Sequence, residues 1–438
     1  MRYHSGFALL VLSCAVASTA PPATIPDYVK TYAPLVYLDQ NEVFFPSDIG
    51  AQVVNTFPDV NFTTLRNASS NLSLDNLAEL NSLGPCTSTS SCEIFLTSKT
   101  DVTRNPSYLF GVLPDPHTFK TAGAISSAVI VHDHGNGVVD AFYMYFYAFN
   151  QGLQIIGQVQ GDHVGDWEHS AIRFQDGKPI SVWLSQHDFG QAFTYNALLK
   201  NGSRPIIYSA IGSHANFAVS GTHSRNESIP GGPVMNVSSI TLDDFTSNGA
   251  IWDPLLSTYY YTFTPSSPSN GTFTPGDSST PVSWLYYLGH WGDKQYPDSD
   301  PRQVDLLNLH LSFKFSDGPT GPLAKGLDRS EICPDRTTGS CVTSTALPAV
   351  SGTSISVTVT RTTATATATG GGGGVSGTGR SSVPSASLVP SPGAAGHVQL
   401  VMGAVLLQFF TVKRLKQFYA RSSEKANSAQ EEVPNSAM

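Results

Sequence analysis

Short apolar and aromatic runs, separated by clusters of Gly, Pro, Asn and Asp, recur along the chain between residues 25 and 341. This rhythm predicts strands, because stretches with a 3.6-residue period are few and 72–83 is the best helical candidate. The run 140–149 is apolar or aromatic on both faces, which predicts a central strand buried on both sides. We therefore predict an all-β fold, an antiparallel β-sandwich with long loops. The predicted strands are 35–38, 127–131, 138–149, 169–174, 180–184, 205–211, 284–288 and 309–315.

The N-terminus predicts entry into the secretory pathway. Arg2 precedes an apolar run at 7–16, and Ala15-Val16-Ala17 is an A-x-A cleavage site, so 1–20 is interpreted as a signal peptide. Seven N-x-S/T sequons follow and predict glycosylation. Their acceptors are Asn61, Asn67, Asn71, Asn201, Asn226, Asn236 and Asn270.

Cleavage of the predicted signal peptide removes Cys14, so four cysteines remain. Their short spacings favour two local disulfides, Cys86 with Cys92 and Cys333 with Cys341, as expected of a secreted protein. Free thiols are the alternative.

The chain changes character after the predicted ectodomain, residues 25–341. Residues 342–396 are rich in Ser, Thr, Ala and Gly, which predicts a disordered, low-complexity stalk. An apolar, anchor-like segment at 397–412 precedes a polar tail at 413–438. Three interpretations stay open: a short single-pass anchor, a GPI-anchor signal with a mispredicted end, and a soluble tail. We favour tethering to a membrane.

Composition narrows the function classes. Only 13% of residues are charged, which excludes a coiled coil and a charge-rich disordered chain, and 10% are aromatic, enough to fill a large core. The net charge is −9, so nucleic-acid binding through a basic patch is not expected.

Candidate chemistry concentrates in the segment 161–169, which holds three carboxylates and two imidazoles. If the chain is extended from Asp166 to Phe174, Asp166 and Glu168 point to one face. With His163 from the preceding turn, they would form a divalent-cation site of Ca²⁺ or Mg²⁺ type. The alternative is a polar loop with Trp167 in the core.

Two further polar segments follow apolar runs. His214 and Asn216 lie among small residues, so His214 could face a pocket; the alternative is a buried histidine bonded to the backbone. Asp293 closes the segment 289–293. Elsewhere, 132–137 is interpreted as a hairpin turn rather than a ligand set, because it ends in Asn-Gly. His187-Asp188 resembles a surface pair and receives no role.

Five ordered motifs together resemble the vacuolar protein sorting-associated protein 62 family of fungi. The resemblance spans about 28 to 340, and its motifs are Tyr32-Ala33-Pro34-Leu35-Val36-Tyr37, 142–150, Gly165-Asp166-Trp167-Glu168-His169, Gly212-Ser213-His214-Ala215-Asn216 and Trp291-Gly292-Asp293. It implies a link to protein delivery to the vacuole, without a settled molecular activity. A secreted, stalked chain would act from the vacuolar lumen or the cell surface.

The segment around His163 also resembles the Gly-His-x-His-Asp-Trp-Glu heptad of necrosis- and ethylene-inducing peptide-like toxins. Those β-sandwich proteins bind a divalent cation and recognise sphingolipid headgroups. The heptad's first His, Asp, Trp and Glu fall on His163, Asp166, Trp167 and Glu168, whereas its Gly and second His fall on Asp162 and Gly165. A further toxin Asp corresponds to Asn150. The resemblance implies that these residues line a cation-dependent headgroup site, while the departures argue against toxin activity.

Three function classes remain open. The first is a module that binds a glycan or lipid headgroup through a cation, with Asn150, Asp162, Trp167, His214, Asn216 and Asp293 as further ligand-binding candidates. The second is a metal-dependent hydrolase in which His214 or His169 acts as general base. The third is a structural cell-surface protein. No nucleophile elbow, phosphate loop or cysteine-rich zinc spacing supports a familiar enzyme class, so we favour binding.

Overall fold

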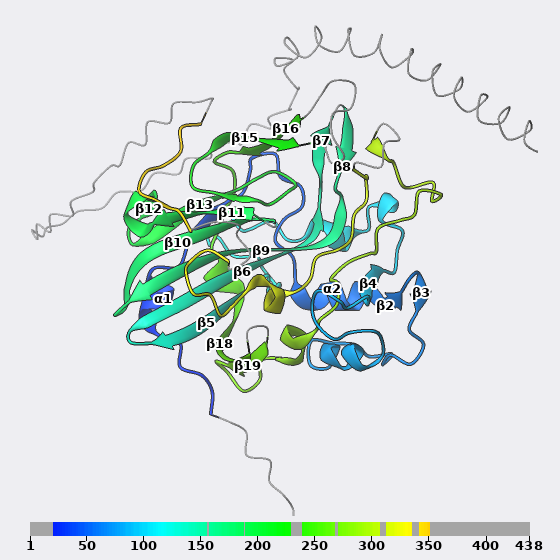
Figure 1. Cartoon of the computed structure of the whole chain (residues 1–438), viewed down its shortest axis with the longest axis horizontal. Helices are drawn as coiled ribbons and strands as arrows, with labels where there is room; N and C mark the ends of the chain where they lie inside the picture. Colours follow the sequence, from blue (N-terminus) through cyan, green and yellow to red (C-terminus); the bar gives the residue numbers. More distant parts are fainter. Residues whose placement is uncertain are drawn as a thin grey trace, which may run out of the picture. The chain divides into compact units, whose positions relative to one another are not determined.

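The computed structural model describes residues 21–155, 157–187, 189–228, 239–267, 270–306, 312–334 and 341–350 (Figure 1). The predicted signal peptide, the apolar segment 397–412, the polar tail and all but the start of the predicted stalk lie outside these residues. In the part that is described, no helix has the length and apolar character needed to cross a membrane.

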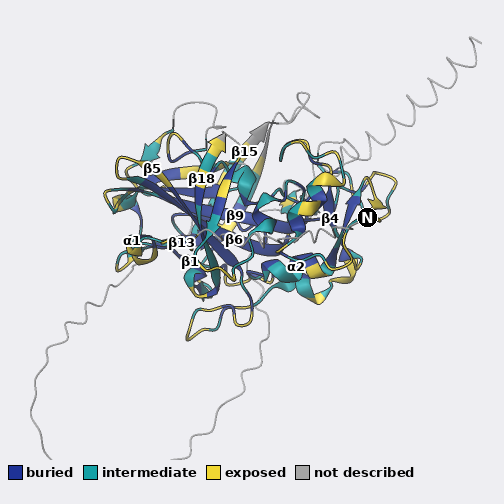
Figure 2. Cartoon of the chain, turned by 90° about the horizontal axis from the view of Figure 1, so that it is seen from below, coloured by how far each residue is buried: buried dark blue, intermediate teal, exposed yellow. Residues whose placement is uncertain are grey.

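An eight-stranded sheet forms the centre of the molecule. Its strands follow the order β19-β18-β5-β6-β9-β10-β11-β20. β6 and β9 are its long middle strands, and Figure 2 shows both as predominantly buried. The bounds are β5 Ser127–Gly135, β6 Val138–Asn150, β9 His163–Gln175, β10 Lys178–Gln186, β11 Phe189–Thr194, β18 Thr258–Ser267, β19 Asn270–Pro275 and β20 Thr343–Ser344.

A five-stranded sheet covers one face of the central sheet. It contains β1 (Leu35–Tyr37), β12 (Lys200–Asn201), β13 (Arg204–Ser209), β14 (Asn216–Phe217) and β17 (Ile251–Trp252). Between the sheets, Val36, Ile207 and Trp252 pack in one apolar cluster with Tyr143 and Tyr145 of β6. Two sheets with a shared core therefore form the predicted sandwich.

Short helices and loops cover the opposite face. There Trp167 of β9 stacks on Trp284 and meets Trp291 edge-on, with ring centroids 5.6 and 5.4 Å away. The other helices and strands are α1 Asp27–Thr31, α2 Ile49–Asn55, the 3₁₀ helices Leu77–Ser82, Val102–Arg104, Ser107–Phe110, Tyr195–Ala197, Pro254–Ser257, Ser283–Tyr286 and Pro322–Lys325, and β2 Thr56–Val60, β3 Thr63–Thr64, β4 Phe95–Ser98, β7 Leu153–Ile155, β8 Gln158–Gln160, β15 Gly221–Ser228 and β16 Ser239–Thr246.

The strand-rich fold class is confirmed, with local differences. Three pairings are parallel: β5 with β18, β1 with β13, and β11 with β20. The segment 284–288 is not a strand, because a 3₁₀ helix at Ser283–Tyr286 turns both Trp284 and Tyr287 into the core at its three-residue period. Within 72–83 the regular element is the 3₁₀ helix Leu77–Ser82. Residues 309–311 of the predicted strand 309–315 lie outside the described residues, and the described part, 312–315, forms isolated bridges at Phe313 and Phe315 instead of a strand.

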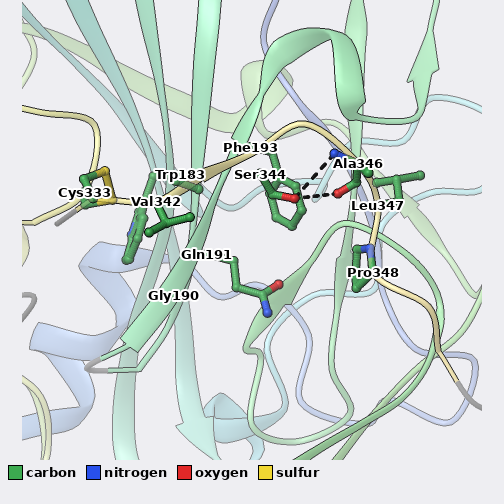
Figure 3. Close-up of a pocket in the computed structure, with 12 residues that line it drawn as sticks. Trp183, Gly190, Gln191, Phe193, Cys333, Val342, Ser344, Ala346, Leu347 and Pro348 are labelled. Carbon is green, nitrogen blue, oxygen red and sulfur yellow. Dashed lines mark hydrogen bonds between the residues drawn. A yellow bond between two sulfur atoms is a disulfide. The ribbon is translucent and has the colours of Figure 1, made fainter. Parts of the chain in front are cut away.

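Both predicted disulfides are present, Cys86 with Cys92 and Cys333 with Cys341. Cys341 begins the segment that adds β20 to the edge strand β11. Figure 3 shows the cavity between this segment and the sheet, with a volume of about 470 Å³. None of the side chains that line it is charged. The cavity thus offers apolar contact and no acid–base chemistry.

Candidate cation site

A glycine at the start of β9 shapes the candidate site. In a regular strand, residues 163 and 166 point to opposite faces. Gly165 has φ +70°, in the left-handed region, and interrupts this alternation. A Cβ atom there would lie 2.3 Å from the Trp291 carbonyl oxygen, so only glycine fits. The break lets His163 and Asp166 face the same side of the strand.

The structure brings His163, Asp166 and His187 together. One potential ligand atom from each lies within 4.8 Å of the others. His163 donates its Nδ1–H to the Gly165 carbonyl over 2.7 Å, which leaves Nε2 with a lone pair for a cation. Burial lowers the pKa of His163 to about 4, against the opposing effect of Asp166, so the ring is neutral at pH 7.

Asp166 is held from behind by His214. His214 Nδ1 lies 2.9 Å from Asp166 Oδ2, and His214 Nε2 lies 3.0 Å from the Phe44 carbonyl oxygen and 3.7 Å from a Glu42 carboxylate oxygen. The ring stacks on Tyr147 with centroids 3.7 Å apart. Because both nitrogens face oxygens that accept, this buried ring fits best as the doubly protonated cation.

The charges of this pair follow from its surroundings. Burial alone would lower the pKa of His214, but the hydrogen bond to Asp166 and the nearby Glu42 carboxylate outweigh it and raise the pKa. Burial would raise the pKa of Asp166, but the hydrogen bond from His214 and that ring's charge lower it. Asp166 is therefore ionised, and its second oxygen is available to a cation.

We expected Glu168 as the third ligand, but it is not part of this cluster. It instead holds the chain next to His187 in place through hydrogen bonds. One carboxylate oxygen accepts the His187 backbone N–H over 2.7 Å, and the other accepts the Ser185 hydroxyl. Burial raises the pKa of Glu168, opposed by His187. These bonds fix the end of β10, where His187 has φ +57°. In the sequence, His187 is marked only by its place in a polar segment shortly after a predicted strand. Such a position is a weak indication of a ligand.

The three residues open into a cleft of about 390 Å³. Asn150, Trp167, Glu168 and Ser213 also line it, together with the cationic side chains Arg225 and Lys325 and the carboxylate Asp317. A cation in the cluster would therefore face a polar, solvent-connected space.

Comparison with known proteins places the chain in a family. TDA6 of Saccharomyces cerevisiae, which carries a vacuolar protein sorting-associated name, is 38% identical over 340 residues, covering 71% of this chain and 69% of TDA6. Vacuolar protein sorting-associated protein 62 of the same yeast is 35% identical over 340 residues, covering 70% and 68%. The chain belongs to the vacuolar protein sorting-associated protein 62 (Vps62) family. The family's sequence pattern matches residues 138–241, which include β6, β9 and the site.

Solved structures of necrosis- and ethylene-inducing proteins are also similar to this Vps62-family chain. Necrosis and ethylene inducing protein 2, from the agent of cocoa's witches' broom disease, is 13% identical with a TM-score of 0.23, covering 56% of this chain and 77% of that one. NLPPya in complex with glucosamine is 10% identical with a TM-score of 0.22, covering 56% and 79%. Scores this low do not establish a shared binding site.

The remaining candidates of the Vps62-family chain lie outside the cation cluster. Asp162 is buried, and its carboxylate accepts the Gly152 backbone N–H over 2.9 Å. Asn216 is fully buried, and its backbone carbonyl oxygen accepts a hydrogen bond from the Gln186 side-chain amide. Trp167 touches the cleft but is fully buried in the tryptophan cluster. Of these, only Trp167 borders the space where a ligand would bind.

His169 is poorly placed to act as a general base. It is buried, and its Nε2 accepts a hydrogen bond from Arg329 over 2.7 Å. Burial and the Arg329 charge lower the pKa of His169 well below its ordinary value. The ring is thus a neutral acceptor already paired with a cation, and it is not among the residues that line the cleft.

The predicted glycosylation sites are compatible with the fold. The acceptors Asn61, Asn67, Asn71, Asn201, Asn226 and Asn270 are all exposed, and Asn236 lies outside the described residues. Glycosylation itself stays a prediction.

Asp293 ties two loops together and is not among the residues that line the cleft. It accepts the Ser98 backbone N–H over 2.7 Å and the Tyr296 hydroxyl over 2.6 Å. Burial raises the pKa of Asp293, although both hydrogen bonds oppose this. The folded chain therefore binds a proton at Asp293 more readily than the unfolded chain does.

A pH dependence follows for Asp293. As the pH falls from 7 through the raised pKa of folded Asp293, the free energy of unfolding should increase. Below the pKa of Asp293 in the unfolded chain it should increase no further. Asp293→Asn should abolish this contribution, because asparagine keeps the acceptor oxygen without the charge. Urea unfolding of both proteins at several pH values between 7 and 4 measures the difference. Parallel curves for the two proteins would contradict the assignment.

Proposed function

We propose that this Vps62-family protein works in the secretory pathway and binds a glycan or lipid headgroup through a divalent cation held by His163, Asp166 and His187. The observation that carries the proposal is the convergence of two imidazoles and a buried, ionised carboxylate at the mouth of a cleft. Two disulfides fit an oxidising compartment. The segment 397–412 would hold the protein at a membrane.

The donor atoms of His163, Asp166 and His187 indicate which cations the site would prefer. Ca²⁺ and Mg²⁺ prefer oxygen ligands, as first expected with Glu168 in the set. With His187 in its place, the set contains two nitrogens and one carboxylate, which suits Mn²⁺ or Zn²⁺ better. Three protein ligands leave coordination positions for hydroxyl or phosphate oxygens of a ligand. Arg225 and Lys325, which line the same cleft, would favour a phosphate.

Binding is favoured over hydrolysis because the candidate bases are already engaged. His214 uses both ring nitrogens as donors and has no lone pair to accept a proton. His169, the other candidate base, already accepts a hydrogen bond from Arg329 at Nε2. The hydrolase hypothesis requires one of these two histidines to activate a water.

The first test is the metal content of the full chain, purified without chelator and measured by inductively coupled plasma mass spectrometry. Asp166→Asn should remove one equivalent of bound cation. Asp317→Asn is the matched control, because Asp317 lines the same cleft but lies outside the cluster. Equal metal content in all three proteins, with Mn²⁺ or Zn²⁺ supplied, would overturn the cation site.

The second test concerns the ligand. Glycan arrays and vesicles with anionic headgroups should bind the unchanged protein, and binding should disappear with EDTA or in Asp166→Asn. Binding that survives both treatments would show that the cation is not part of recognition.

A further inference from the structure

A second cluster of metal-ligating side chains lies at the opposite end of the central sheet. His132 and His134 stand near the end of β5, and Asp328 approaches them from the loop after the helix Pro322–Lys325. One potential ligand atom from each lies within 4.8 Å of the others. Measured along β6 by the strand pairing, this cluster is seven to ten residues, or roughly 24–34 Å, from the first site. The two clusters share no residue.

Both histidines of this cluster lie on β5, in the hairpin that joins β5 to β6. Asn136 and Gly137 adopt left-handed φ values of 53° and 76°, which confirms the predicted hairpin turn. The pairing shifts by one residue between Asp133 and Gly135. Residues two apart in a strand share a face, and the imidazole rings of His132 and His134 lie side by side, with centroids 4.0 Å apart. The segment 132–137 therefore contains both the predicted hairpin turn and two of the three potential ligands.

Outer partners orient both rings as they do around bound metals. His134 Nε2 lies 2.9 Å from Asp140 Oδ2, and Arg173 donates two hydrogen bonds, of 2.8 and 2.7 Å, to the same carboxylate. Because Arg173 holds Asp140 as an acceptor, His134 donates through Nε2, which leaves Nδ1 for a metal. His132 Nδ1 lies 3.1 Å from the Leu327 carbonyl oxygen.

The cluster is also open to solvent on one side. A cavity of about 550 Å³ is lined by His134 and Asp328 together with Arg173. The side chain of Asp328 is 38% exposed, whereas that of His132 is 4% exposed.

We propose that His132, His134 and Asp328 form a second divalent-metal site, of Zn²⁺ type, with an open coordination position facing this cavity. Two imidazoles and one carboxylate with a fourth, exchangeable position are a usual zinc set. Ligand atoms on a tetrahedral zinc ion are about 3.4 Å apart, so the cluster must contract by about 1 Å. The exposed Asp328 can supply that movement.

The experiment titrates Zn²⁺ into the metal-free full chain by isothermal calorimetry, with Co²⁺ absorption as a second readout. Asp328→Asn and His134→Gln should each weaken one binding event by more than tenfold, and Co²⁺ should lose its tetrahedral absorption there. Glutamine at position 134 can still donate to Asp140, and Asp328 is exposed, so both variants should fold. Asp133→Asn is the matched control, since Asp133 lies between the histidines and its carboxylate accepts the Gly135 N–H in the turn.

Two results would overturn the proposal. One is Zn²⁺ binding of unchanged affinity and stoichiometry in both Asp328→Asn and His134→Gln. The other is an equal loss in Asp133→Asn, which would show that the turn and not the ligand set matters. Because Asp166→Asn removes only the first site, its result is independent of this one.

Discussion

Replacement of Arg329 by methionine is expected to lower the free energy of unfolding by about 3–5 kcal/mol, because several buried acceptors lose their donor. Arg329 is 1% exposed, yet its guanidinium is charged. It donates to the carbonyl oxygens of Lys325, Gly326 and Ile332 and to Nε2 of His169. Methionine would fill much of the volume but would leave these buried acceptors without donors, and each such loss costs about 1–3 kcal/mol.

Urea unfolding at neutral pH, with the disulfides intact, measures this effect. Arg302→Met is the control, because Arg302 pairs with Asp300 near the surface and its side chain is 30% exposed. Loss of a pair of that kind costs at most about 1 kcal/mol. Arg329→Lys should fall between the two, since lysine keeps the charge but not the fork of donors. Equal losses in Arg329→Met and Arg302→Met would show that the buried guanidinium does not organise this loop.

The centre of the fold was predictable because it depends on local composition. The run that became β6 is apolar or aromatic on both faces, and only a strand in the middle of a sheet can bury both. The parallel pairing of β5 with β18 was not predictable, because their paired residues are about 130 positions apart. That pairing depends on the path of the intervening chain, which no local pattern encodes.

The candidate site was likewise predictable only where it depends on the local sequence. The density of titratable side chains identified His163 and Asp166, but strict alternation along the strand favoured Glu168 as the third ligand. The left-handed conformation of Gly165 interrupts the alternation of side chains along β9, and the pairing of β9 with β10 places His187, at the end of β10, beside the site. That placement depends on sheet order and on a backbone conformation at Gly165, and neither can be calculated from residue types alone.

His214 shows how the same residue type can take opposite charge states in one fold. His214 stacks on Tyr147 and bonds to a carboxylate and a carbonyl, and its pKa is raised, although burial alone would lower it. His223 stacks on Phe217 with the same 3.7 Å separation, but its Nε2 bonds to a carbonyl and a hydroxyl oxygen. Burial lowers the pKa of His223 to about 4. The two rings share the same stacking distance but differ in their partners, and His214 is fully buried whereas His223 is only partly buried.

His214→Leu should therefore destabilise the chain far more than His223→Leu. Leucine at 214 leaves the buried carboxylates Asp166 and Glu42 without the cation between them, a loss of about 3–5 kcal/mol. Leucine at 223 removes hydrogen bonds to neutral oxygens, worth about 1–1.5 kcal/mol. Urea unfolding at pH 7 in EDTA measures both without a bound cation. Similar losses would mean that His214 is neutral, and Asp166 would then lack the positive partner that keeps it ionised for metal binding.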